Sequence, residues 1–268
     1  MAKRIIFTLL FEDGYFVQSR NFKLQRVGDF NWLRDNYNFK KISSSIDELI
    51  VLNISRNDEF TEDFLSVLSL LSDETFIPIS SGGGIKKIVE VENLFKNGAD
   101  KVVINSLLFS KPKFIESLAD RYGNQAIIAS VDIKKDGDAY FVWSNCGSIK
   151  QPILIEDWLK TLSKFPIGEI LVHSIDNDGV GEGMEIGIKN LLPEDLTMPV
   201  ILSGGAGKPS HLIEALRINH FDAVATANLF NFIGNGLQLS REKIIFSKIE
   251  LPEWDPNLIE LNRNIFTN

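Results

Sequence analysis

The sequence predicts a single (βα)8 barrel, a TIM barrel, built from two duplicated half-barrels, and three observations carry this prediction. The run Arg4–Gly14 returns as Ala126–Gly137, and each copy is an apolar segment that ends in Asp-Gly. Three later motifs recur in the same order and at the same spacing, as Gly82 and Gly204 illustrate. Short apolar runs also alternate with longer amphipathic stretches, which is typical of βα units around a parallel sheet. A repeat of this length indicates a duplicated half.

The hydrophobic pattern places the elements in order. Strands are expected at Ile5–Leu10, Leu49–Ile54, Phe76–Ser80, Lys101–Ile104, Ile127–Val131, Glu169–Val172, Val200–Leu202 and Ala223–Ala225. Helices are expected at Glu62–Leu71, Ile85–Asn97, Pro112–Tyr122 and Lys208–Asn219. The region Asn21–Phe39 is expected to form a loop over the barrel mouth and then a short helix. Ile133–Pro152 is expected to be a long polar connection, which at that length is more often functional than idle.

Length and composition fit one large domain. With 268 residues, 44% of them hydrophobic, the chain can bury an ample core. The barrel is expected to occupy residues 1–250, as half-barrels of about 1–122 and 123–250. Residues 251–268 have no repeat partner and are expected to form a C-terminal tail.

The charge balance argues against two classes of partner. A net charge of −8 disfavours nucleic acid and anionic membranes. No segment approaches the roughly 20 apolar residues of a membrane span. The one cysteine, Cys146, cannot form an internal disulfide, which indicates a reducing cytoplasm. We expect no metal and no organic cofactor.

Two glycine clusters follow the third and seventh strands, on the face where such barrels carry their chemistry. Consecutive glycines let backbone N–H groups approach a phosphate, and the following helix adds a favourable dipole. The glycines could instead serve tight turns, and the sequence leaves that alternative open. The residues expected to form the two phosphate or substrate sites are Gly82, Gly83, Asn105, Ser106, Gly204, Gly205, Ala227 and Asn228.

Carboxylates are the candidates for proton transfer at the mouth. Asp132 ends the fifth strand, where it can act as a general acid or base, or cap a turn. A twofold site would have a second carboxylate at position 10, but Leu10 cannot transfer a proton. Asp176 and Asp178 follow the sixth strand, and the Asp-Gly pair at 178 also resembles a plain turn. His173 is expected to be packed and hydrogen-bonded rather than catalytic.

Four charged residues stand at the beginnings of the first, second, fourth and sixth strands: Arg4, Glu48, Lys101 and Glu169. Two cations and two anions at the floor of one barrel can close a ring of ion pairs over its axis. Such a ring is costly to bury and is weak evidence for stability. The ring could therefore act as a polar gate or as a stabilising network, and the sequence does not decide between these two interpretations.

Together these motifs resemble the cyclase subunit of imidazole glycerol phosphate synthase, a (βα)8 barrel of the histidine pathway. The matching segments run in order from about residue 2 to residue 230: AKRII, IDEL, SGGGI, GADKVVIN, GEIL, SID and SGGAG. The resemblance implies that a glutaminase subunit docks on the floor and releases ammonia. The ammonia would pass the charged ring and react at the mouth with a substrate held by two phosphate sites.

The resemblance also assigns roles to residues. Asp132 carries over as one of two catalytic aspartates, and the ring Arg4, Glu48, Lys101 and Glu169 carries over completely. The implied phosphate contacts are Gly82, Gly83, Asn105, Gly179, Gly204 and Gly205, with Asn228 where the family usually has serine.

Three departures concern the chemistry. The family's first catalytic aspartate is Leu10 here, a lysine of the family is Gln18, and its aspartate on the second strand is Asn53. A positioned proton-transfer group contributes about 10²–10⁴-fold in rate, so its loss should be costly. The ammonia machinery is kept while the cyclisation machinery is altered.

This combination resembles diverged paralogues of surface-polysaccharide (lipopolysaccharide) pathways. Those paralogues work with a glutaminase and an ATP-pyrophosphatase-type protein to convert an acetamido group on a sugar nucleotide into an acetamidino group. One alternative is a genuine histidine-pathway cyclase in which another group, such as Glu12 or Asp178, replaces the missing aspartate. A second alternative is a non-catalytic barrel that activates its glutaminase or conducts ammonia.

Overall fold

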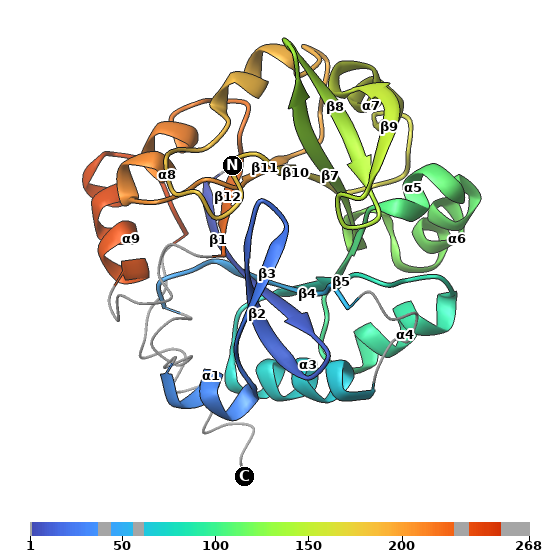
Figure 1. Ribbon diagram of the computed structural model, residues 1–268, viewed down its shortest axis with the longest axis vertical. Coiled ribbons are helices and arrows are strands. Elements are labelled where there is room, and N and C mark those ends of the chain that lie inside the picture. The colour runs from blue at the N-terminus through green and yellow to red at the C-terminus, as the bar shows by residue number, and fades with distance from the viewer. Residues whose placement is uncertain (1, 37–43, 56–61, 228–235, 253–268) are drawn as a thin grey trace.

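The computed structural model describes residues 2–36, 44–55, 62–227 and 236–252, and they form a closed barrel of eight parallel strands (Figure 1). The barrel strands are β1 (Arg4–Glu12), β4 (Glu48–Asn53), β5 (Ile79–Gly82), β6 (Lys101–Ile104), β7 (Ile127–Asp136), β10 (Glu169–Ser174), β11 (Val200–Ser203) and β12 (Ala223–Thr226). The last strand, β12, pairs with β1 in parallel, with Arg4 opposite Ala223, and closes the sheet. The predicted fold class is confirmed.

Helices surround the barrel (Figure 1). They are α1 (Phe30–Asn36), α3 (Glu62–Glu74), α4 (Ile88–Lys96), α5 (Ser106–Ser110), α6 (Pro112–Tyr122), α7 (Ile155–Leu162), α8 (Pro209–Leu216) and α9 (Gly236–Phe246), with 3₁₀ turns η1 (Asn124–Ala126) and η2 (Ile186–Leu191). Several predicted boundaries shift: for example, the helix expected at Lys208–Asn219 ends three residues early as α8, and the strand expected at Ile127–Val131 continues to Asp136. β5 begins after Pro78, because proline has no N–H for the strand ladder. α4 begins three residues late, because Lys87 is the N-cap and holds an extended backbone, with φ −136° and ψ 155°.

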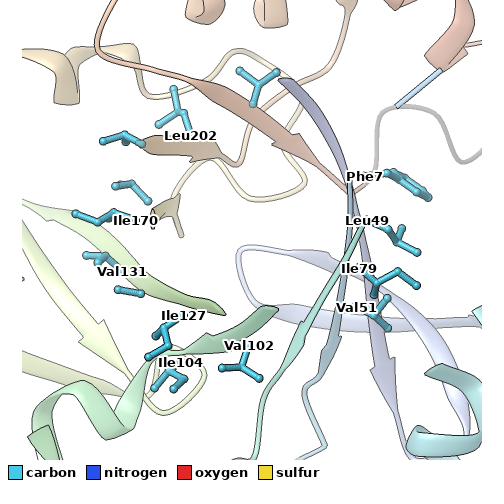
Figure 2. Packing of buried hydrophobic residues seen from close by; sticks show 14 of the residues in the cluster. Phe7, Leu49, Val51, Ile79, Val102, Ile104, Ile127, Val131, Ile170 and Leu202 are labelled. Carbon is cyan, nitrogen blue, oxygen red and sulfur yellow. The ribbon is translucent and has the colours of Figure 1, made fainter. Parts of the chain in front are cut away.

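Apolar side chains on the two faces of the sheet form two separate clusters. Outward-facing residues such as Phe7, Leu49 and Ile79 pack between the sheet and the helices (Figure 2). The inner cluster fills the barrel and comprises Ile6, Ile50, Val103, Ile128, Leu171, Ile201, Ala223 and Ala225. This alternation follows the two-residue period of a strand. Hydrocarbon therefore lines much of the lumen between floor and mouth, together with the buried hydroxyls of Thr8, Ser80 and Ser130 on the same face.

At the floor, aspartates form paired hydrogen bonds with the backbone of a neighbouring strand, and this contact explains part of the repeat. Asp100 donates its N–H to the carbonyl of Ile79 at 2.7 Å and accepts the Ile79 N–H on its side chain at 2.8 Å. Asp222 makes the same two bonds with Val200, at 2.9 and 3.0 Å. Asp47 repeats the pattern with Ile5, at 2.8 and 2.7 Å. The repeated aspartates thus fix strand starts.

Antiparallel hairpins extend β1 and β7 at equivalent places in the two halves. The four additional strands are β2 (Tyr15–Arg20), β3 (Lys23–Gly28), β8 (Ala139–Ser144) and β9 (Ile149–Leu154). Each hairpin turns at the repeated Asp-Gly pair, where Gly14 has φ 86° and Gly137 has φ 62°. The repeat therefore includes these turns as well as the barrel strands.

Two sequence predictions need correction here. The segment 133–152 is not a polar connection, because Ile133 and Val142 pair across β7 and β8 and are buried. Within the loop and short helix expected at 21–39, Lys23–Gly28 form the strand β3 instead of a loop, whereas the predicted helix is present as α1; residues 37–39 lie outside the described residues. Residues 253–268 of the predicted tail lie outside the described residues.

Candidate active site

Polar side chains gather on one side of the mouth, at the ends of β7, β10 and β11. Asp132 lies opposite His173 in the register of β7 and β10, and His173 lies opposite Ser203 in that of β10 and β11. The lumen residues Ile128 and Leu171 precede Asp132 and His173 by even steps along their strands. Asp132 and His173 consequently face the inside of the barrel, next to each other.

Asp132 is held in a state suited to proton transfer. Asn105 donates its amide to Asp132 Oδ2 at 3.2 Å and to the carbonyl of Ser130 at 3.1 Å. Burial raises the pKa of Asp132 to about 6, with His173 opposing the rise and Asp178 adding to it. Both protonation states of this carboxyl group are therefore accessible near neutral pH, as general acid–base catalysis requires.

His173 makes contacts through both ring nitrogens. Its Nε2 lies 3.5 Å from Asp178 Oδ1 and its Nδ1 lies 3.0 Å from Ser203 Oγ. The ring of Phe22 stacks on the imidazole, with centroids 5.5 Å apart. Burial alone would lower the pKa of His173, but the hydrogen bond and charge of Asp178 and the charge of Asp132 outweigh burial and raise it.

Asp178 anchors this side of the mouth and is buried. Its Oδ2 accepts the Ser19 hydroxyl at 2.5 Å and the N–H of Phe22 at 3.1 Å. Burial works against the charged form, yet the bonds from His173, Ser19 and Phe22 lower the pKa of Asp178. The Asp-Gly pair predicted as a possible plain turn therefore also places a carboxylate in the site.

The β2–β3 hairpin crosses the mouth and reaches the loop after β10 (Figure 1). At its tip, Asn21 donates its amide to the carbonyls of Ile175 and Asp176, at 3.2 and 2.7 Å. Its backbone N–H donates to the carbonyl of Asp178 at 2.9 Å. The Asp176 carboxylate accepts the N–H of Lys135 at 2.8 Å and so holds the β7–β8 hairpin rather than the proton-transfer group.

The facing side of the mouth is apolar. Leu10 lies opposite Leu52 in the register of β1 and β4, and both are partly exposed. Asn53 points the other way along β4, and its side chain accepts the N–H of Ser55 at 3.1 Å. The buried amide nitrogen of Gln18 has no hydrogen-bond partner within the part of the chain that the structure describes.

The glycine clusters bring backbones into close contact at equivalent points. A Cβ on Gly83 would lie 1.8 Å from the carbonyl oxygen of Asn53, and one on Gly205 would lie 1.9 Å from that of Gly183. Gly179 is similarly close to Ser19, at 2.1 Å. Packing alone therefore requires glycine at these places, and phosphate binding by these loops stays a prediction.

The other predicted contacts lie around the same rim. Gly82 and Gly204 open the two glycine clusters, each at the end of a barrel strand or directly after it. Ser106 begins α5, and its hydroxyl accepts the N–H of Asn145 at 3.1 Å. Ala227 directly follows β12, whereas Asn228 lies outside the described residues.

At the floor the four charged residues do meet, as a closed ring of ion pairs. Arg4 binds Glu169 at 2.7 Å and also binds Glu48. Lys101 binds Glu169 at 2.5 Å and Glu48 at 3.4 Å. Although burial opposes both charges, the paired groups raise the pKa of Arg4 and lower that of Glu169. The ring separates the floor from the apolar lumen.

Sequence reasoning did not single out Ser19 and Ser203 and interpreted His173 as packed. Ser203 carries the clearer signal, because it precedes the second glycine cluster and is paired in register with His173. Ser19 reaches Asp178 from the other end of the chain, and no local pattern indicates that contact.

Two negative observations apply to the described residues. Across 2–36, 44–55, 62–227 and 236–252, no group of three or more His, Cys, Asp or Glu side chains could hold a metal ion. Over the same ranges no helix is long and apolar enough to cross a membrane.

Known proteins are similar to this sequence over most of its length. A family model described as "Histidine biosynthesis protein" matches residues 4–234. The protein named "Putative imidazole glycerol phosphate synthase subunit hisF2" of Parasynechococcus marenigrum is 46% identical over 254 residues, which cover 94% of each chain.

Relatives named "Imidazole glycerol phosphate synthase subunit HisF" are less similar. The one from Pelodictyon phaeoclathratiforme is 36% identical over 245 residues, covering 90% of this chain and 95% of the relative. The one from Bacillus cereus is 33% identical over 253 residues, covering 94% and 99%.

Proposed function

This chain belongs to the histidine biosynthesis protein family, among the HisF-like cyclase subunits of imidazole glycerol phosphate synthase, and from that premise we propose that it is the ammonia-using subunit of a glutamine amidotransferase. In this proposal ammonia condenses at the barrel mouth with a carbonyl carbon of a phosphorylated substrate. Asp132 supplies one proton-transfer group. The two glycine clusters bind the phosphates.

The observation that carries the proposal is the contrast between Asp132 and Leu10. Asp132 has a pKa near 6 inside a polar cluster, while the equivalent position in the first half presents hydrocarbon. A cyclase with two aspartates has lost one of them here. We therefore propose a diverged paralogue that converts an acetamido group of a sugar nucleotide into an acetamidino group, as in lipopolysaccharide biosynthesis.

The floor supports the partner in this proposal. A glutaminase would dock below the ring of Arg4, Glu48, Lys101 and Glu169, and its ammonia would pass the ring into the lumen. The inner cluster around Ile50 and Leu171 suits a small neutral molecule better than ammonium, because a charge is costly to bury there. An ATP-pyrophosphatase-type protein would be the third partner, and the complex would work in the cytoplasm.

A second candidate function is that of a genuine histidine-pathway cyclase. The names of the relatives at 33–36% identity favour it. In that case another group, such as Glu12 or Asp178, would replace the missing aspartate.

One assay separates the two functions. The purified chain is given the histidine-pathway bisphosphate substrate with a high concentration of ammonium salt, which bypasses the glutaminase, and substrate loss is followed. We expect no rapid turnover by the folded wild type and a large gain in Leu10→Asp. Rapid wild-type turnover that Leu10→Asp leaves unchanged would instead establish the histidine-pathway cyclase. Leu10→Asn, which adds polarity without a carboxylate, is the matched control.

A further inference from the structure

His173 has polar contacts at the barrel mouth that the proposed function does not explain. It sits on the inner face of β10, beside Asp132 and two residues after the apolar Leu171 of the lumen. Both ring nitrogens have polar partners, Asp178 and Ser203. An imidazole between a carboxylate and a hydroxyl at a barrel mouth is placed as a base is placed in catalytic triads.

We propose that His173 is the second acid–base group of the mouth reaction and works with Asp132 in place of the carboxylate missing at position 10. This inference rests on the proposed function and names a further residue of the same site. Its support is geometric. His173 and Asp132 are cross-strand neighbours on the inner face, whereas Leu10 lies on a strand of the other half.

The condensation needs two such groups. The lone pair of ammonia forms the C–N bond and the carbonyl π electrons move to oxygen. The new nitrogen then loses two protons. On a simple carbonyl the oxygen gains both and leaves as H₂O, so that C=O and NH₃ become C=NH and H₂O; on an acetamido carbonyl activated by ATP through the third partner, the oxygen leaves with AMP and the two protons pass to the acid–base groups. A base near the nitrogen and an acid near the oxygen carry these protons, and they exchange roles between the two transfers. Asp132 and His173 form such a pair.

Asp178 is a positioning residue in this arrangement. Its oxygens accept bonds from His173, Ser19 and the N–H of Phe22, so that the carboxylate has no proton to give and holds the ring in one orientation. It also stabilises the imidazolium, as the aspartate of a triad does. The charged groups that act on His173 are Asp178 and Asp132.

Ser203 and Phe22 complete the environment. The Ser203 hydroxyl contacts His173 Nδ1 at 3.0 Å and directly precedes Gly204, which places the imidazole beside the second glycine cluster. The stacked ring of Phe22, at the tip of the β2–β3 hairpin, covers one face of the imidazole and limits water there. A substrate phosphate held by that cluster would lie within reach of His173.

The kinetic test compares His173→Gln with His220→Gln, an exposed histidine after α8. With ammonium and an acceptor that the wild type converts, we expect His173→Gln to lower kcat by about 10²–10⁴-fold with little change in KM. One limb of the pH–rate profile should disappear in His173→Gln and the other in Asp132→Asn. His220→Gln should match the wild type. A folded His173→Gln enzyme with both limbs and near wild-type kcat would overturn the proposal.

An NMR titration decides the question without any substrate. Carbon-13-labelled histidine gives signals for the three histidines, and His173→Asn and His220→Gln assign them. We expect Asp132→Asn to lower the pKa of His173, and Asp178→Asn to lower it further. A His173 signal whose titration ignores Asp132→Asn would overturn the proposal. If the wild type converts no acceptor, the proposed function fails and the titration alone decides the role of His173.

Discussion

The two half-barrels place different side chains at equivalent points of the mouth, Leu10 in the first half and Asp132 in the second. Around them, the first half presents hydrocarbon from Leu10 and Leu52, whereas the second half presents Asp132, His173 and Ser203. The backbone plan is nevertheless shared, down to the positive φ of Gly83 and Gly205. The two halves therefore share a backbone frame, while Asp132, His173 and Ser203 place polar side chains at the mouth in the second half alone.

The floor differs from the mouth, because both half-barrels contribute to its cluster of charged side chains. The charged ring takes Arg4, Glu48 and Lys101 from the first half and Glu169 from the second, and all four are paired. The ring depends on both halves, so that losing one member leaves the others incompletely neutralised. The comparison shows that the charge balance of the floor needs both halves, whereas Asp132, His173 and Ser203 at the mouth all come from the second half.

The largest expected effect tests whether proton transfer depends on the second half. With an acceptor that the wild type converts, Asp132→Asn should reduce ammonium-driven turnover by about 10²–10⁴-fold, because the amide cannot exchange the proton. The matched control is Asp136→Asn, an exposed carboxylate further along β7, which should keep wild-type turnover. An unchanged output from Asp132→Asn in the full complex would instead point to a barrel that only conducts ammonia.

The next effect concerns the ring that joins the halves. Glu169→Gln should lower the free energy of unfolding by on the order of 3 kcal/mol, because Arg4 and Lys101 keep one carboxylate between them. Urea denaturation measures it. The exposed pair of Lys160 and Asp157 serves as the control, and Asp157→Asn should change stability by about 0–1 kcal/mol. Equal losses of unfolding free energy in Glu169→Gln and Asp157→Asn would contradict the expected contribution of the ring to stability.

The third effect is a pH dependence of stability. Because the pKa of Asp132 is about 6 in the folded protein and near 3.8 when unperturbed, the folded state binds more protons between these values. Its ionisation therefore costs stability as the pH rises from about 4 to about 6. Asp132→Asn should become more stable than the wild type above that range, by up to about 3 kcal/mol.

Thermal or urea unfolding at pH 4 and pH 7 measures this difference between wild type and variant. A variant that is less active and yet more stable would show that the mouth of the second half holds a costly charge. A constant difference at both pH values would show that Asp132 ionises normally.

The smallest effect tests the shared frame. Asp100→Ala and Asp222→Ala each remove the acceptor of one backbone N–H, of Ile79 and Val200 respectively. Each should lower the free energy of unfolding by about 1–2 kcal/mol. Comparable losses in urea denaturation would support equivalent roles, whereas a loss in one variant alone would break the equivalence of the halves at the floor.

Repetition made much of the fold predictable. The barrel class and most strand positions follow from apolar runs that recur at one spacing, because each βα unit must bury the same face. The β8 strand was missed although Tyr140–Trp143 is a continuous apolar run, because the charged and polar residues on both sides of it led to the whole segment being interpreted as a loop. The start of α4 was misplaced because a hydrophobic pattern does not show that Lys87 holds an extended backbone as the N-cap.

By itself, the sequence determined the duplicated barrel, the four charged residues of the floor, and the mismatch of Leu10 with Asp132 at equivalent positions of the two halves. These are properties of residue type and spacing. Tertiary structure alone decided that Ser19, His173 and Asp178 form one cluster beside Asp132, because Ser19 and Asp178 are distant in the chain and meet only when the β2–β3 hairpin crosses the mouth. It also decided the protonation of Asp132, since burial, rather than local sequence, raises its pKa.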